Sequence, residues 1–253
     1  MLLEDRVVIV TGGGHGIGRA YALGVAREGG KVVVADIDGQ AADTVAEEIG
    51  GAGGQALAVQ ADVSKLASCQ DMTKATLDRF GKVDGLINNA AIFSTIPITR
   101  AGFQDISEEE WDRTMDVNVK GVWLCCRAVA PAMQERKQGS IVNISSSTVL
   151  NGSATRIHYV ASKAAIVGFS RVLARELGPD NIRVNTIAPG STLSELNPSE
   201  ATLEHRRRGI GDRAIPRVER PDDLVGTALY LLSDLSSFVT GQMIVVGGGD
   251  SMH

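Results

Sequence analysis

Thr11-Gly12-Gly13-Gly14-His15-Gly16-Ile17-Gly18 follows a valine-rich apolar run, Arg6 to Thr11, and leads into a helical pattern from about Ile17 to Gly29. Glycines in the turn between a strand and a helix let backbone N–H groups and the positive end of the helix approach a pyrophosphate. The common dinucleotide spacing G-x-G-x-x-G does not occur here, and the glycines at 12, 16 and 18 follow G-x-x-x-G-x-G instead. The stretch predicts either a phosphate-binding turn or a glycine-rich turn that only makes the connection between strand and helix tight.

A carboxylate on the next apolar run favours the phosphate-binding interpretation. In the run Lys31 to Ile37, Asp36 comes 18 residues after Gly18, near the ~20 residues expected for the acid that binds an adenosine ribose. This carboxylate can accept hydrogen bonds from two ribose hydroxyls, and it would repel a 2′-phosphate. The alternative is that Asp36 is an aspartate of a turn. However, the turn at Asp38-Gly39 accounts for Asp38 better than for Asp36. We therefore expect NAD as the cofactor.

Apolar runs and helical patterns alternate along the whole chain. Strands are expected at 6–11, 31–37, 56–63, 83–90, 140–146, 182–188 and 243–246, with helices at 17–29, 40–49, 64–80, 107–137, 157–177 and 221–233. Ser64 is the expected N-cap of the third helix, and Ser107 with Glu110 forms an expected capping box. Strand–helix alternation implies right-handed crossovers and a mostly parallel α/β sheet with helices on both faces.

One domain is expected over residues 1–253, because no Pro/Ser-rich linker, composition shift or solenoid repeat divides the chain. The segment 190–217 is the least regular, and it is long for a loop in a compact domain. Such segments are often functional, so we expect a substrate lid there. Its charge run, His205-Arg206-Arg207-Arg208, is most often a solvated helix face. Contact between one of these arginines and an anionic substrate or a cofactor phosphate is the alternative.

Composition limits the class of protein. Hydrophobic residues are 43% of the chain, charged residues 22%, and the net charge is -5, which argues against disorder and against general affinity for nucleic acid or anionic membrane. No apolar run reaches the ~18 residues of a transmembrane helix. Cys69, Cys125 and Cys126 are too few for a disulfide framework, so a cytoplasmic location is expected. The four histidines do not pair at metal-ligand spacing, so no metal site is expected.

Tyr159 and Lys163 form a candidate catalytic pair. They lie four residues apart on an expected helix and so share one face. An ammonium beside a phenol favours the phenolate, which makes the tyrosine a candidate general acid/base for an alcohol or carbonyl. Ser146 ends the fifth expected strand, 13 residues before Tyr159, and its hydroxyl can donate to a carbonyl oxygen as charge develops. Its neighbours Ser145 and Ser147 are the alternatives for this role if the spacing differs by one residue.

Several motifs together resemble the short-chain dehydrogenases/reductases over essentially the whole chain. They are the Thr11–Gly18 turn, Asn88-Asn89-Ala90-Ala91, Asn118, Ser146, Tyr159-x-x-x-Lys163 and Pro189-Gly190. The resemblance implies a single-domain Rossmann-type doubly wound sheet of about seven parallel strands that also carries the active site. Together with the apolar character of the long helix around Val122 to Cys126, it implies a homotetramer or dimer formed through helices 107–137 and 156–178.

The resemblance also implies roles for single residues. Tyr159 would donate and accept the proton, Lys163 would lower its pKa and bind the nicotinamide ribose, Ser146 would orient the substrate oxygen, and Asn118 would support Lys163 through a bound water. For Asn118, the alternative to this role is a residue at a kink in a long helix. For Asp62, the alternative to a cofactor contact is a turn residue at the end of a strand. The implied cofactor contacts are Gly12, His15, Gly16, Ile17, Gly18, Asp36, Ile37, Asp62, Val63, Asn89, Ala90, Tyr159, Lys163, Pro189, Gly190, Thr192 and Ser194.

Two departures from the family pattern concern the carboxyl-terminal part. Ser194 stands where the family often has threonine, and Thr192 is a second candidate for that contact. The chain reads Gly247-Gly248-Gly249-Asp250 where the family tends to have Asp-Gly-Gly.

We therefore expect an NAD(H)-dependent oxidoreductase that transfers a hydride between the nicotinamide and a small-molecule secondary alcohol or ketone. A 3-oxoacyl-thioester reductase of the same family and a non-catalytic dinucleotide-binding sensor are the alternatives. Neither nucleic acid nor membrane is an expected partner.

Overall fold

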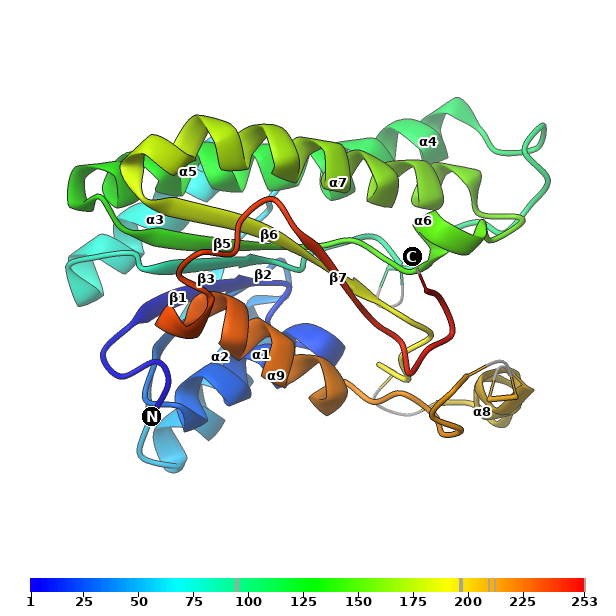
Figure 1. The fold of residues 1–253 in the computed structure, drawn as a ribbon, viewed down its shortest axis with the longest axis horizontal. Helices are drawn as coiled ribbons and strands as arrows, with labels where there is room; N and C mark the ends of the chain where they lie inside the picture. Colours follow the sequence, from blue (N-terminus) through cyan, green and yellow to red (C-terminus); the bar gives the residue numbers. More distant parts are fainter. Residues whose placement is uncertain (94–95, 196–197, 209, 212, 253) are drawn as a thin grey trace.

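A computed structural model describes residues 1–93, 96–195, 198–208, 210–211 and 213–252. Within these residues, seven strands form one parallel sheet in the order β3-β2-β1-β4-β5-β6-β7 (Figure 1). The strands are β1 (Val7–Thr11), β2 (Lys31–Asp36), β3 (Gln55–Gln60), β4 (Gly85–Asn88), β5 (Gly139–Ile144), β6 (Ile182–Pro189) and β7 (Met243–Val246). The order reverses direction between β1 and β4, and parallel sheets bind ligands at the carboxyl ends of such a switch point.

Helices cover both faces of this sheet (Figure 1). On one face lie α1 (Gly16–Arg27), α2 (Gly39–Gly51) and α9 (Asp222–Leu232), and on the other lie α3 (Leu66–Phe80), α5 (Gly121–Arg136) and α7 (Ile157–Leu177). Side chains of β1 alternate between the two cores, with Val8 and Val10 in the first and Ile9 in the second. A strand buried on both faces must be apolar throughout, which explains the valine-rich runs. The predicted fold class is confirmed.

The long helix expected at 107–137 is divided into three pieces. These are α4 (Glu108–Met115), a π-helical turn (Asp116–Lys120) and α5. Ser107 caps α4 by accepting a 3.2 Å hydrogen bond from the backbone N–H of Glu110. The Glu110 carboxylate instead accepts from the backbone N–H of Thr99 at 2.9 Å. Only half of the expected capping box therefore forms.

The expected cap at Ser64 is wrong. Lys65 is the N-cap residue of α3, and among the described residues no side chain caps this helix. The hydroxyl of Ser64 donates to Asp62 Oδ1 at 2.6 Å, and its backbone N–H donates to the same oxygen at 3.0 Å. Because β3 ends at Gln60, both residues lie in the turn before the helix, where an aspartate–serine turn competes with capping.

The irregular segment expected at 190–217 contains a helix, α8 (Glu200–Arg208), which stands away from the sheet in Figure 1. Arg207 is exposed and forms a 3.1 Å ion pair with Glu200, in keeping with a solvated face. The side chains of His205, Arg206 and Arg208 lie outside the described residues, as do residues 196–197, 209 and 212. The remaining short elements are α6 (Thr148–Asn151) and the 3-10 turns Gly178–Asp180 and Asp234–Ser236.

No helix among the described residues is long and apolar enough to cross a membrane. The same part of the chain holds no group of three or more His, Cys, Asp or Glu side chains placed to bind a metal ion.

Candidate active site

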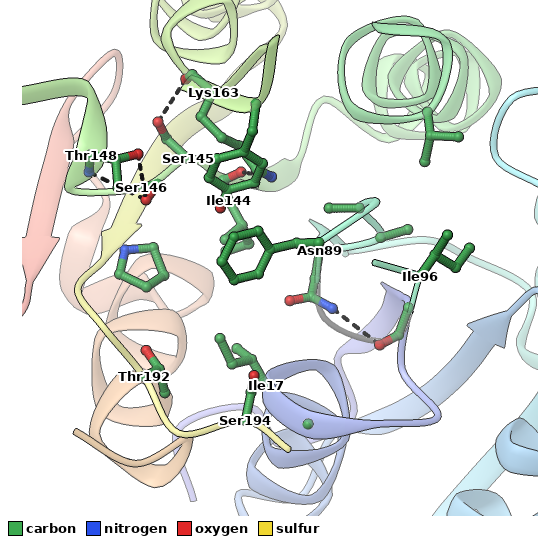
Figure 2. Close-up of a pocket in the computed structure, with 18 of the residues that line it drawn as sticks. Ile17, Asn89, Ile96, Ile144, Ser145, Ser146, Thr148, Lys163, Thr192 and Ser194 are labelled. Carbon is green, nitrogen blue, oxygen red and sulfur yellow. Dashed lines mark hydrogen bonds between the residues drawn. The ribbon is translucent and has the colours of Figure 1, made fainter. Parts of the chain in front are cut away.

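A cavity of about 340 Å³ opens at the carboxyl ends of the strands, at the switch point of the sheet. Its wall is formed by residues that follow β1, β2, β3, β4, β5 and β6, so segments far apart in the sequence meet here. Figure 2 shows Lys163, Ser146 and Thr148 on one side of the open space and Ile17, Thr192 and Ser194 on the opposite side. Of the candidate cofactor and catalytic residues, all line the cavity except Gly18 and Asn118.

The glycine turn leaves no room for side chains. A Cβ atom at Gly18 would stand 1.8 Å from the carbonyl oxygen of Gly12, and one at Gly12 would stand 2.9 Å from the Cα atom of Ala90. Gly12 also has a φ of 62°, in the left-handed region that favours glycine. Gly18 therefore acts by packing behind the turn, and Gly12 lets the wall of the cavity approach a ligand closely.

Helix α1 begins at this turn with its amino-terminal N–H groups open to the cavity. Its N-cap residue is His15, and among the described residues no side chain caps the helix or places an acid in its first turn. Gly16 and Ile17, in that first turn, line the cavity. An uncapped helix start binds anions through its free N–H groups and its dipole. These residues fit the pyrophosphate of a dinucleotide.

Asp36 is fixed at the end of β2. Its Oδ2 atom accepts a 2.9 Å hydrogen bond from the N–H of Gly14, and its Oδ1 atom accepts a 3.1 Å bond from the N–H of Asp38. The side chain lines the cavity although the residue is only 8% exposed. The neighbouring Ile37 is exposed and carries no charge. The carboxylate thus faces the ligand space with its orientation set by the glycine turn itself.

Asn89 and Asp62 complete this end of the cavity. The Asn89 amide donates to the carbonyl oxygens of Thr11 and Gly12, both at 3.1 Å, and so ties the end of β4 to the glycine turn (Figure 2). Asp62 accepts from Ser64 and forms a 2.9 Å ion pair with Lys65, contacts that lower its pKa. Asp62 therefore is a turn residue, and it also lines the cavity.

Tyr159 and Lys163 lie one turn apart on α7, at the other end of the cavity. The Lys163 Nζ atom lies 5.8 Å from the centroid of the Tyr159 ring and donates a 3.0 Å hydrogen bond to the carbonyl oxygen of Ile144. Burial lowers the pKa of Lys163 to about 8. A buried ammonium is costly to leave unpaired, so it favours negative charge on the adjacent phenol.

Ser146 has a hydroxyl available to a ligand in the cavity, whereas Ser145 does not. Its Oγ atom accepts a 3.0 Å hydrogen bond from the hydroxyl of Thr148 and, among the described residues, donates to none (Figure 2). The Ser145 hydroxyl, by contrast, donates to the carbonyl oxygen of Lys163 at 2.7 Å. Ser145 thus anchors α7 to the end of β5, whereas Ser146 keeps its proton for a ligand in the cavity.

Asn118 is fully buried in the π-helical turn, so the long helix is irregular at this residue. Its Oδ1 atom accepts from the N–H of Ile92 at 2.8 Å, and its Nδ2 atom donates to the hydroxyl of Ser162 at 3.1 Å. That hydroxyl donates in turn to the carbonyl oxygen of Tyr159 at 2.7 Å. The side chain of Asn118 therefore holds the helix segment that carries Tyr159.

Among the described wall residues that the sequence did not predict, three carry aromatic or charged side chains. The ring of Phe93 stacks on the ring of Tyr159 with the centroids 4.5 Å apart, Arg156 lies just before α7, and Asp250 reaches the cavity from the carboxyl-terminal tail. Arg156 could have been found, because it stands three residues before Tyr159. Phe93 carries no local signal, and Asp250 is marked only by the departure from the family pattern at 247–250. Only the tertiary fold brings both residues to the site.

Asp250 belongs to a buried acidic region beside the Pro189-Gly190 turn. A Cβ atom at Gly190 would stand 2.6 Å from Glu219 Oε2 and 3.0 Å from Asp250 Oδ2. Burial raises the pKa of Glu219 to about 7. Arg213 lies 3.7 Å from the same Glu219 oxygen and partly offsets the cost of burying it.

The sequence profile described as short chain dehydrogenase matches residues 6–204. The chain belongs to this family. It is 38% identical to the (2S)-[(R)-hydroxy(phenyl)methyl]succinyl-CoA dehydrogenase subunit BbsD of Thauera aromatica, over 100% of this chain and 99% of that protein. It is 34% identical to the 3-oxoacyl-[acyl-carrier-protein] reductase FabG of Thermotoga maritima, over 98% of this chain and 99% of the reductase.

Solved short-chain dehydrogenases have the same fold. A 3-ketoacyl-(acyl-carrier-protein) reductase from Brucella melitensis, complexed with NADH, superposes with a TM-score of 0.89 and 36% identity, covering 99% of this chain and 100% of the other. A short-chain type dehydrogenase/reductase from Mycobacterium marinum gives 0.90 and 34%, covering 99% and 97%. The protein is thus an oxidoreductase of a family that binds nicotinamide dinucleotides.

Proposed function

We propose that the protein is an NAD(H)-dependent dehydrogenase/reductase for a small secondary alcohol or ketone. The observation that carries this proposal is that Ser146, Tyr159 and Lys163 line the same cavity as Asp36. The first three supply acid–base chemistry at an oxygen atom, and the carboxylate suits an unphosphorylated adenosine ribose.

The cofactor site would run from Asp36 to Lys163. The open start of α1 would bind the pyrophosphate, Asp36 the adenosine ribose, and Lys163 the nicotinamide ribose. The Pro189-Gly190 turn with Thr192 and Ser194 would border the nicotinamide. When bound, the nicotinamide supplies or takes up the hydride. The NADH complex of the Brucella melitensis reductase supports this site by similarity.

The chain's own residues would handle the proton. The Tyr159 hydroxyl gives a proton to the carbonyl oxygen in reduction, and its phenolate form takes a proton from the alcohol in oxidation. Lys163 stabilises the phenolate form of Tyr159 through its buried positive charge, and Ser146 donates a hydrogen bond to the substrate oxygen as negative charge develops there. Asn118 positions Tyr159 through Ser162.

A 3-oxoacyl-thioester reductase is the second candidate, favoured by the similarity to the Thermotoga maritima enzyme. Asp36 argues against it, because such reductases usually prefer NADPH and the carboxylate would face a phosphate dianion. A 3-oxoacyl thioester assayed with NADPH and with NADH separates the two candidates. A non-catalytic dinucleotide sensor would not need the complete set of Asn118, Ser146, Tyr159 and Lys163.

We also propose a homotetramer, or a dimer, formed through α5 and α7. Trp123 on α5 and Val172 on α7 are 47% and 58% exposed, which leaves apolar surface on both helices. Light scattering at micromolar concentration should give the mass of an oligomer, and a clean monomer would contradict the assembly.

The segment 190–217, with α8, would cover the substrate as a lid. The cytoplasmic location remains a prediction.

Replacement of Tyr159 by phenylalanine tests the chemistry. Tyr159→Phe removes only the hydroxyl, so NADH binding, measured by its fluorescence, should persist while kcat falls ~10²–10⁴-fold. The matched control is Tyr230→Phe in α9, which is remote from the cavity lining and should keep wild-type kcat. A Tyr159→Phe enzyme with wild-type kcat would overturn the proposed role.

A further inference from the structure

Arg156 lies in the cavity wall beside the groups proposed to act on the substrate. Its guanidinium carbon is 5.8 Å from the centroid of the Phe93 ring, and the Phe93 ring stacks on Tyr159 with the centroids 4.5 Å apart. The Phe93 ring thus contacts both side chains. The distance from the Arg156 guanidinium carbon to the centroid of the Tyr159 ring is therefore no greater than the sum of these two distances. A substrate oxygen held at Tyr159 would therefore have this cation in the same part of the cavity.

We propose that Arg156 binds a carboxylate of the substrate, and that the enzyme acts on secondary alcohols or ketones carrying a carboxylate a few bonds from the reacting carbon. This inference rests on the proposed function. Arg156 is then a residue that determines specificity, and it takes no part in the proton transfer.

The other charged groups of the described cavity wall suit other roles. Lys163 is buried under Tyr159 and bonded to the carbonyl oxygen of Ile144. His15, Asp36 and Asp62 lie at the ends of β1, β2 and β3, in the part suited to adenosine. Asp250 is the acidic residue to consider as a competing partner of Arg156. However, its carboxylate is packed against the backbone, with Oδ1 2.2 Å from the position that a Cβ of Gly247 would occupy.

The surroundings of Arg156 suit a carboxylate. Its guanidinium donates to the hydroxyl of Ser153, and Ser153 lines the same wall, so a hydroxyl stands beside the cation. Phe93, Ile96 and Val117 line the same cavity, and apolar walls strengthen an ion pair by lowering the local dielectric. The planar fork of arginine matches two carboxylate oxygens. The phosphates of a coenzyme A thioester lie beyond the pantetheine arm, too far from the reacting carbon for this contact.

The test compares a series of 3-oxo acids with their methyl esters, assayed with NADH in the wild type and in Arg156→Gln. We expect the wild type to prefer the acids. In Arg156→Gln the kcat/KM for acids should fall ~10- to 100-fold, mainly through KM, whereas the values for esters stay within about threefold. Arg156→Lys should restore part of the loss. The matched control is Arg171→Gln, an exposed arginine within α7 that does not line the cavity.

NADH binding should be unchanged in every variant, which shows that the cofactor site is intact. If the esters are reduced as well as the acids by the wild type, or if Arg156→Gln lowers both equally, the inference is wrong and the proposed function stands. If NADH binds but neither acids nor esters are reduced, the proposed function and the inference both fail.

Discussion

The two ends of the cavity are built in different ways. At the adenosine end, backbone N–H groups hold the carboxylates: Asp36 accepts from the N–H groups of Gly14 and Asp38, and Asp38 caps α2 by accepting from Ala41 at 3.1 Å. At the catalytic end, Phe93, Tyr159 and Asp250 come from three distant segments. The first end depends on backbone geometry that few residue types permit. The second depends on tertiary packing, where several side chains are compatible with the same fold.

The largest expected effect comes from filling the glycine turn. In Gly18→Ala, the new Cβ would meet the Gly12 carbonyl oxygen at 1.8 Å, and backbone cannot move aside as a side chain tip can. We expect a loss of about 3 kcal/mol or more in the free energy of unfolding and no measurable NADH binding. Chemical denaturation and NADH fluorescence measure the two effects.

Gly168→Ala is the control for that experiment. Gly168 lies within α7, and a Cβ there would meet nothing within 4 Å. Alanine stabilises a helix interior by ~1 kcal/mol relative to glycine, so this variant should be slightly more stable and bind NADH normally. Wild-type stability and binding in Gly18→Ala would show that the turn is not as tight as its geometry indicates.

The same contrast explains what the sequence predicted. The alternation of apolar runs and helices predicted the sheet, because strands buried on both faces must be apolar at every position. Gly12, Asp36, Tyr159 and Lys163, which line one cavity, were predicted as site residues because their proposed roles need particular residue types at fixed spacings. The cap at Ser64 was wrong, since a local turn with Asp62 competes for the same hydroxyl, and no single-residue preference decides between two such partners.

The residues that surround the substrate could not be predicted in this way. Phe93 and Asp250 reach the cavity through loops and the tail, and their positions depend on packing that involves the whole fold. The π-helical turn at Asp116–Lys120 inserts within a helical pattern that is otherwise continuous. Its position follows from the bonds of Asn118 to Ile92 and Ser162, which no pattern along the chain reveals.

A second prediction concerns the choice of cofactor at the adenosine end. A 2′-phosphate would place negative charge near the Asp36 carboxylate, and like charges ~4 Å apart cost about 4 kcal/mol at an effective dielectric of ~20. A preference of ~10²-fold for NAD(H) needs only about 2.7 kcal/mol. We expect at least that preference in kcat/KM, and a shift toward NADP(H) in Asp36→Ala combined with Ile37→Arg.

Ile37→Arg alone is the control for the charge at Asp36. Ile37 is exposed, so arginine fits there without repacking, but the carboxylate remains and NAD(H) should stay preferred. Equal efficiency of the unmodified enzyme with both cofactors would place Asp36 away from the ribose.

The smallest expected effect lies at the catalytic end and depends on pH. Burial raises the pKa of Glu219 to about 7, above its usual value of 4.5, so the folded protein holds this proton more tightly than the unfolded chain. The resulting stability is complete below pH ~4.5 and is lost as the pH rises through about 7. One pKa unit corresponds to ~1.4 kcal/mol, so we expect a loss of about 2 kcal/mol between pH 5 and 8.

Glu219→Gln keeps the shape of the protonated acid but cannot ionise. Its free energy of unfolding should therefore change less across this pH range, and the variant should be more stable than the wild type at pH 8. The exposed Glu47→Gln in α2 is the matched control and should keep the wild-type slope. Urea denaturation at pH 5, 6, 7 and 8 measures all three proteins. If Glu219→Gln has the same slope as the wild type, Arg213 and its neighbours keep Glu219 ionised, and the acidic region beside Gly190 is an ordinary ion pair.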